Sequence, residues 1–285
     1  MNICIMLRKA LIHSIILLSA TTVHAQNLQV GLAGGGMMYH GDLTSKPLFD
    51  MRSATAASIH FAPNDRFLLS AEYMFGHIGA SDLNRPEISD RNLHFDSYVF
   101  EHSVNLRINL VTSPRWAFIP YVQGGAAIFY VNPFTNEASG NRVYLYYTHT
   151  EGRGLPQYPE LEVNQLRRLS IPMGGGFELR VSSRISLDVE AMTRFTNSDQ
   201  LDDVGGVYPD LSRLNGTNTP FRQDLSYRAL EIPGTNDYYP AAGTPRGNPD
   251  KRDWYSSIHF RLRYTLFGET GGRRLTLMTG DTWLY

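Results

Sequence analysis

A histidine and an aspartate occupy alternate positions in the segment His40-Gly41-Asp42. An imidazole oriented by a carboxylate acts as a general base toward a hydroxyl nucleophile in acyl-transfer sites. The sequence does not identify that hydroxyl, because nucleophile and base meet only in the folded chain. Glycine and aspartate are also common turn residues, and we favour a turn here. A lipid A-modifying enzyme that uses His40 is the lesser alternative.

Four aspartates lie close together further along the chain, at Asp199, Asp202, Asp203 and Asp210. Calcium prefers carboxylate oxygens at such a density, but the spacing does not match an EF-hand loop. Turns, capping and solvated charge are the favoured interpretation, and cation binding stays open. We therefore expect no catalytic residue, no metal and no cofactor.

Charged residues recur at alternate positions of long apolar segments. Successive residues of a β-strand point to opposite faces, so these charges share one face of their strands. Inside a closed barrel, acidic and basic side chains of this face would form structural ion pairs, an interpretation we favour over a proton or substrate path. The predicted interior ion-pair residues are Glu101, Arg107, Glu178, Arg180, Asp188, Glu190, Arg194, Arg261 and Arg263.

The elements that carry these charges are predicted β-strands. Period-2 alternation occurs in eight segments, at residues 28–39, 54–61, 67–76, 95–111, 116–130, 166–181, 185–196 and 254–267. Most of these segments are longer than the five or six residues usual in soluble sheets. Their length suits a tilted transmembrane strand, which needs about 9–11 residues.

The connections between the segments alternate strictly between short and long. Tight turns are predicted at 63–66, 112–115 and 182–184, and long loops at 40–53, 77–94, 132–165 and 197–253. Outer-membrane barrels have short periplasmic turns and longer outer loops. We therefore predict an all-β fold, an eight-stranded antiparallel transmembrane β-barrel with long outer loops, short periplasmic turns and both termini in the periplasm. Side chains fill the interior of a barrel of this size.

The first 25 residues resemble a secretory signal peptide. Arg8 and Lys9 precede a short apolar run at 10–20, and Val23-His24-Ala25 offers a cleavage site. The predicted organisation is a signal peptide at 1–25, the barrel at 26–267 and a periplasmic tail at 268–285. Cys4 is the single cysteine and falls within the signal, so no disulfide or thiolate site is expected in the barrel. A net charge of −1 without a basic patch argues against nucleic acid as a partner.

Aromatic residues cluster near the predicted strand ends. Membrane barrels carry girdles of such residues at both interfaces with water, and we expect these side chains to form them. The predicted girdle residues are Tyr39, Tyr98, Trp116, Tyr130, Trp254, Tyr255 and Phe267.

Two blocks of sequence resemble a family of outer-membrane barrels from Bacteroidota. The segment 34–43 is similar to the family's opening pattern G-G-G-x-x-Y-x-G-D-L, and a Gly-rich strand at 174–176 leads through a tight turn to a second pattern, L-D-D-V-x-x-x-Y-x-D, at 201–210. The matching residues are Gly34, Gly35, Gly36, Tyr39, Gly41, Asp42, Leu43, Gly174, Gly175, Gly176, Leu201, Asp202, Asp203, Val204, Tyr208 and Asp210.

The resemblance implies a function without catalysis. The family includes the PorG-type component of the type IX secretion system, a barrel that associates on its periplasmic side with ring subunits of that system. We expect a non-enzymatic outer-membrane barrel that anchors or organises an envelope complex. Its expected partners are outer-membrane lipid and periplasmic secretion-ring subunits or other envelope proteins. The alternative is a surface-exposed binding or adhesion barrel that acts through its long outer loops.

Overall fold

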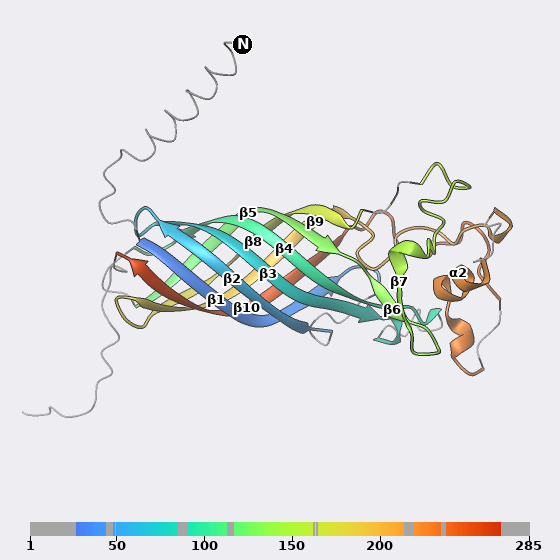
Figure 1. Cartoon of the computed structure of the whole chain (residues 1–285), viewed down its shortest axis with the longest axis horizontal. Helices are drawn as coiled ribbons and strands as arrows, with labels where there is room; N and C mark the ends of the chain where they lie inside the picture. Colours follow the sequence, from blue (N-terminus) through green and yellow to red (C-terminus); the bar gives the residue numbers. More distant parts are fainter. Residues whose placement is uncertain are drawn as a thin grey trace, which may run out of the picture.

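The protein forms a closed β-barrel. The computed structural model describes residues 27–43, 48, 50–84, 91–112, 117–161, 163, 165–213, 219–234 and 238–268. The predicted signal peptide, nearly all of the predicted tail (269–285) and Trp116 lie outside the described residues. Eight antiparallel strands make the wall (Figure 1): β1 (Asn27–His40), β2 (Arg52–Ala62), β3 (Phe67–Ser81), β4 (His94–Asn109), β5 (Phe118–Val131), β8 (Arg167–Arg180), β9 (Ile185–Ser198) and β10 (Asp253–Phe267).

Each of these eight strands pairs with the next one of the wall, β5 with β8 included, and β10 pairs with β1 to close the sheet. The register of the closing pair runs from Leu28 opposite Phe267 to His40 opposite Trp254. These pairings confirm the predicted eight-stranded antiparallel barrel. Strand β3 continues past the predicted end at Gly76, because it pairs with β4 as far as Ser81 opposite His94.

The burial pattern alternates along the strands, as in β4. Charged and polar side chains point inward and are buried, whereas apolar side chains point outward and are exposed. Leu32 and Leu169, for example, are 69% and 73% exposed. An exposed apolar surface around a whole barrel is the surface that lipid covers in membrane barrels. Other exposed outward residues include Val30, Ile59, Leu69, Phe75, Val104, Leu106, Val122, Ile171, Phe177, Val189, Phe260 and Leu262.

The two ends of the barrel differ. One end carries the tight turns around 63–66 and 182–184, the start of β1 and the end of β10 (Figure 1). The other end carries the long loops, which contain the hairpin of β6 (Phe134–Asn136) and β7 (Arg142–Tyr144) and the helix α2 (Thr219–Ser226). We call the folded loops at this end the outer cap. No helix in the described part of the chain is long and apolar enough to cross a membrane.

An apolar core lies inside the barrel beneath the outer cap. It contains Met37, Tyr39, Phe95, Phe129 and Tyr255, each at most 1% exposed. The prediction that Tyr39 and Tyr255 belong to an interfacial girdle is therefore wrong. Both occupy inward positions of β1 and β10, and alternation along a strand, not nearness to its end, decides which face a side chain takes.

The other predicted girdle residues that the structure describes lie on the outer wall. Tyr98, Tyr130 and Phe267 are 38%, 37% and 66% exposed. Trp254 is half-buried and stacks on His40, with ring centroids 3.6 Å apart.

Candidate functional site

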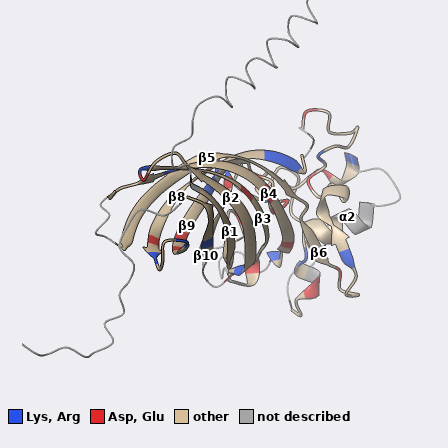
Figure 2. Ribbon diagram, turned by 60° about the vertical axis from the view of Figure 1, so that its left-hand side comes forward, with Lys and Arg blue, Asp and Glu red and all other residues tan. Residues whose placement is uncertain are grey.

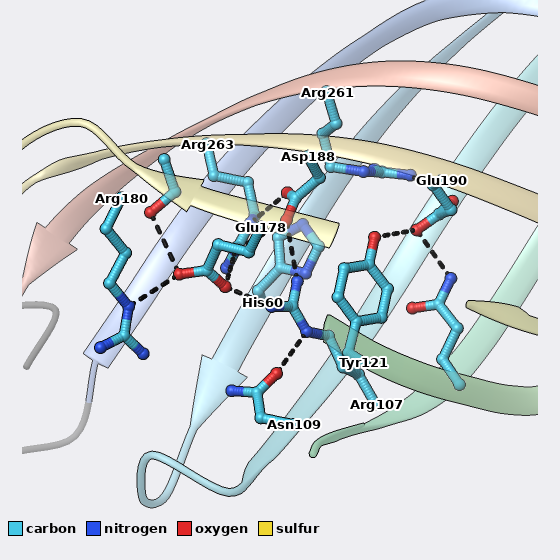
Figure 3. A network of polar contacts seen from close by, with 12 residues as sticks. His60, Arg107, Asn109, Tyr121, Glu178, Arg180, Asp188, Glu190, Arg261 and Arg263 are labelled. Carbon is cyan, nitrogen blue, oxygen red and sulfur yellow. Dashed lines mark hydrogen bonds and ion pairs between the residues drawn. The ribbon is translucent and has the colours of Figure 1, made fainter. Parts of the chain in front are cut away.

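Arg107 lies at the centre of a charged network in the barrel interior (Figure 3). Its guanidinium donates to Asp188 Oδ1 at 2.9 Å and pairs with Glu178. Arg263 approaches the same two carboxylates, with its Nε 2.6 Å from Asp188 Oδ2. Arg180 Nε lies 2.9 Å from Glu178 Oε1. Two carboxylates from β8 and β9 are thus held by three arginines from β4, β8 and β10.

A second group lies nearer the middle of the barrel. Arg261 contacts Glu72 at 2.5 Å and Glu190 at 3.2 Å. Gln123 and Tyr121 donate to the other oxygen of Glu190, at 2.7 Å and 3.2 Å. Glu72 was missed by the sequence reasoning, although its alternate position in the segment 67–76 is the signal that would have identified it.

A third group lies below the apolar core. Arg194 Nε lies 3.3 Å from Glu101 Oε1, and the Tyr255 hydroxyl donates to Glu101 Oε2 at 2.5 Å. The structure thus places all nine predicted interior residues inside the barrel and joins each to an ion-pair partner.

The interior network balances its charges. Within the described residues, five carboxylates (Glu72, Glu101, Glu178, Asp188, Glu190) face five guanidiniums (Arg107, Arg180, Arg194, Arg261, Arg263). Each of these residues is at most 8% exposed. Charges buried to this extent are tolerated only when they are paired and hydrogen-bonded. A water-filled channel would leave these charged side chains accessible to solvent, so the interior of the barrel is occluded.

Above this charged network, Tyr39 joins the barrel to the outer cap. Its hydroxyl lies 2.6 Å from Asp202 Oδ2 and 2.8 Å from Asp253 Oδ1, and it accepts the Asp42 amide N–H at 3.1 Å. One hydroxyl proton serves only one of two carboxylates, so the arrangement favours protonation of the other. Burial raises the pKa of Asp202 to about 8. A Cβ at Gly41 would lie 1.8 Å from the Tyr39 hydroxyl, which only glycine avoids.

The two blocks of the family resemblance meet at this point. Asp42 Oδ2 accepts the Asn248 amide at 2.6 Å, while Leu43, Leu201 and Val204, each at most 1% exposed, belong to one apolar cluster with Tyr39. Residues far apart in the sequence therefore form a single structural unit at the base of the outer cap. The two glycine triplets of the motifs lie in the strands instead, Gly34–Gly36 in β1 and Gly174–Gly176 in β8.

Glu151 and Arg246 form the buried centre of the outer cap. Arg246 Nη1 lies 3.0 Å from Glu151 Oε1, and the amides of Gly205 and Gly206 donate to the same oxygen at 3.0 Å and 3.1 Å. Arg246 also donates to the carbonyls of Ser226 and Asp203. Burial pushes the pKa of Glu151 upward, but the Arg246 charge and the Gly205 amide outweigh it and hold that pKa below its usual range.

Other contacts extend the outer cap across its loops. Arg228 donates to Thr135 Oγ1 at 2.6 Å and to the Asn136 carbonyl at 2.7 Å, which ties the α2 region to β6. Tyr208 packs in a triad with Tyr227 and Tyr239, with centroids 5.5–6.2 Å apart.

The His40–Asp42 pair that the lesser, enzymatic alternative requires does not form. His40 Nε2 lies 2.7 Å from Ser256 Oγ, on the outward side of the wall, whereas Asp42 binds the Asn248 amide. Alternation separates the two side chains, because inward Tyr39 places its neighbour His40 on the outer face. The partners described for His40, Ser256 and Trp254, include no carboxylate that would orient it as a base.

The four aspartates of the 199–210 segment take different places. Asp203 accepts from Thr150, Asp202 binds Tyr39, and Asp210 lies apart and caps Ser212 at 2.9 Å. Neither oxygen of the Asp199 carboxylate has a hydrogen-bond partner within the described residues. No group of three or more metal-ligating side chains suited to a metal ion occurs in the part of the chain that the structure describes.

Comparison with solved structures returns bacterial β-barrels. Neisserial surface protein A (NspA) aligns with a TM-score of 0.43 at 9% identity, covering 85% of this chain and 100% of that chain. Ail of Yersinia pestis aligns with a TM-score of 0.41 at 7% identity, with the same coverages. The N-terminal β-barrel domain of Pseudomonas aeruginosa OprF gives 0.35 and 12%, again over 85% and 100%. Likeness at this level carries no argument about function.

Comparison with curated proteins gives no match. The family model described as "Domain of unknown function (DUF6089)" matches residues 8–219, which include both motif blocks. Since the match extends over most of the sequence, the chain belongs to the DUF6089 family.

Proposed function

We propose that this protein is a non-enzymatic β-barrel of a bacterial outer membrane that anchors or organises an envelope complex. The apolar outer wall supports membrane insertion, because a closed barrel satisfies its backbone groups within lipid. The sorting of tight turns to one end and long loops to the other supports an orientation with both termini in the periplasm and the outer cap at the cell surface.

The observation that carries the proposal is the occluded interior. Five ion-paired carboxylates and five guanidiniums fill the barrel, and the apolar core around Tyr39 and Phe95 lies above them. A barrel filled in this way offers no conduit for a solute. Its function therefore belongs to its two end surfaces.

A PorG-type role in type IX secretion is the specific form of this proposal. It rests on the resemblance of segments 34–43 and 201–210, which meet in this protein where Tyr39 contacts Asp202. The periplasmic partners would be ring subunits of the secretion system. They would contact the end that carries the turns 63–66 and 182–184.

A pull-down of the full chain from detergent-solubilised membranes of its own bacterium tests the proposal. We expect co-purification of secretion-ring subunits, and a loss of them when Arg66 and Arg184 in the tight turns are both changed to Glu. Arg246→Met, which perturbs the opposite end, is the matched control and should retain them. Recovery of no ring subunit or other periplasmic envelope protein would overturn the proposal.

The alternative is binding at the cell surface through the outer cap. The feature that favours it is the burial of Arg228 and Arg246, each 3% exposed, which shows that the loops fold into a body with a defined surface. The same pull-down separates the two functions. A partner that is lost with Arg246→Met and kept with the turn variant would support surface binding instead.

A further inference from the structure

Strands β8 and β9 separate at their outer ends. Their pairing stops at Ser170 opposite Thr196, although β8 begins at Arg167 and β9 continues to Ser198. On its other side, β8 remains paired with β5 as far as Arg167 opposite Tyr130. A side-chain contact, from the Arg168 guanidinium to the Ser198 hydroxyl, bridges the opening. The barrel wall therefore has a seam at this position.

A cavity of about 710 Å³ occupies this seam, a size typical of small-molecule sites. Its apolar wall includes Leu169 and Ile128, which are 73% and 41% exposed on the outside of the barrel. Tyr130, paired with Arg167, and Phe195 of β9, paired with Ile171, are outward aromatics near these strand ends. Aromatics of this kind mark the boundary between hydrocarbon and headgroups. The cavity thus adjoins lipid at the depth of the outer headgroups.

The polar wall of the cavity is rich in arginine. Arg167 is exposed, Arg168 is half-buried with its Nε lacking a hydrogen-bond partner within the described residues, and Arg153 lies 3.3 Å from Glu151. A guanidinium presents several donors in a planar fork that matches the oxygens of a phosphate. Figure 2 shows that charged residues are also present in the loops of the outer cap, beyond the ends of the strands.

We propose that this cavity binds a phosphate-bearing lipid of the outer leaflet, with the phosphate on Arg167 and Arg168 and an acyl chain along Leu169 and Ile128. The inference rests on the proposed position in the outer membrane and is independent of any protein partner.

Asp199 supports the assignment. Asp199 is one of the residues that line the same cavity, and both oxygens of its carboxyl are buried without a hydrogen-bond partner within the described residues. Burial, with Asp42, Asp202 and Glu151 nearby, raises its pKa to about 8, and Arg153 opposes this rise. At neutral pH the protonated carboxyl places no negative charge beside the phosphate. Above pH 8 it becomes an anion that repels the ligand.

The test measures binding to the full chain in micelles of a phosphate-free detergent. The probes are phosphorylated lipid A, dephosphorylated lipid A and inorganic phosphate. We expect tight binding of phosphorylated lipid A alone. The variant Arg167→Gln/Arg168→Gln should weaken it by about tenfold or more, as expected for loss of a charge-assisted hydrogen bond. The control Arg66→Gln/Arg142→Gln makes the same change in charge away from the cavity and should bind like the wild type.

Three outcomes would overturn the proposal. The first is equal binding of the two lipid A forms, and the second is equal binding by the two double variants. The third is binding of inorganic phosphate as tight as that of lipid A, which would identify a free-anion site. A shift between heated and unheated samples on a denaturing gel verifies that each variant is folded. Between pH 7.5 and pH 9, lipid A binding should weaken in the wild type and stay constant in Asp199→Asn; parallel profiles would remove Asp199 from the site.

Discussion

Replacing Arg246 with Met should open the outer cap and leave the barrel intact. Arg246 is 3% exposed and its partner Glu151 is 4% exposed, with 3.0 Å between Nη1 and Oε1. Removing one member of a buried pair costs about 3–5 kcal/mol, because the other charge stays buried without its partner. Glu151 would keep the two glycine amides and Arg153 at 3.3 Å, so we expect the lower value, about 3 kcal/mol. This corresponds to about a 100-fold larger open fraction of the outer cap.

Limited proteolysis of the chain in nanodiscs measures this effect. Cleavage in 132–165 and 197–253 should accelerate about 100-fold when opening is fast relative to cleavage, while the heat-dependent gel shift of the barrel stays unchanged. The double variant Arg246→Met/Glu151→Gln removes both charges and should recover much of the loss. Wild-type cleavage rates in Arg246→Met, or a double variant with the sum of the two single effects, would refute the role assigned to the pair.

Three further predictions concern the interior, the outer cap and His40. Arg107→Met should lower the stability of the barrel by about 3–5 kcal/mol, read from urea unfolding in detergent micelles, because Glu178 and Asp188 lose a shared partner; an unchanged midpoint would contradict the network. The raised pKa of Asp202, about 8 against about 3.9 unfolded, means that its contribution to stability is complete below pH 4 and is lost as the pH rises through 8. Protease sensitivity of the outer cap should therefore increase from pH 5 to pH 9 and depend less on pH in Asp202→Asn; a profile that this change leaves untouched would count against the shift. His40→Ala should not change the structure of lipid A, read by mass spectrometry, since the contacts described for His40 are Ser256 and Trp254. A changed lipid A would support the enzymatic alternative.

The fold follows from local patterns of the sequence. Inward Glu101 and Arg107 alternate with outward Phe100 and Leu106 on β4. This period is a property of the extended backbone, so it holds whichever strands are neighbours. Loop lengths are also local, and their alternation between short and long predicted that the long loops lie at one end of the barrel and the tight turns at the other.

Contacts between distant segments were beyond the reach of these patterns. The shared hydroxyl of Tyr39 joins Asp202 and Asp253 across more than 160 and 210 positions of sequence. Nothing local to His40 indicates that its ring stacks on Trp254 while Asp42 turns to Asn248. The error at Tyr39 and Tyr255 has the same origin, because aromatic character alone does not report which face of the wall a side chain takes.

The sequence by itself therefore determined the barrel, its eight strands and the charges of its interior, because strand periodicity and chain connectivity are encoded residue by residue. Only the tertiary structure decided which charges pair, how the loops fold into the outer cap around Glu151 and Arg246, and where β8 and β9 separate. These features depend on strand register and on the meeting of loops remote in sequence. Register depends on which face of each strand is buried and on the geometry of the turns, and the loops meet only once the sheet has closed.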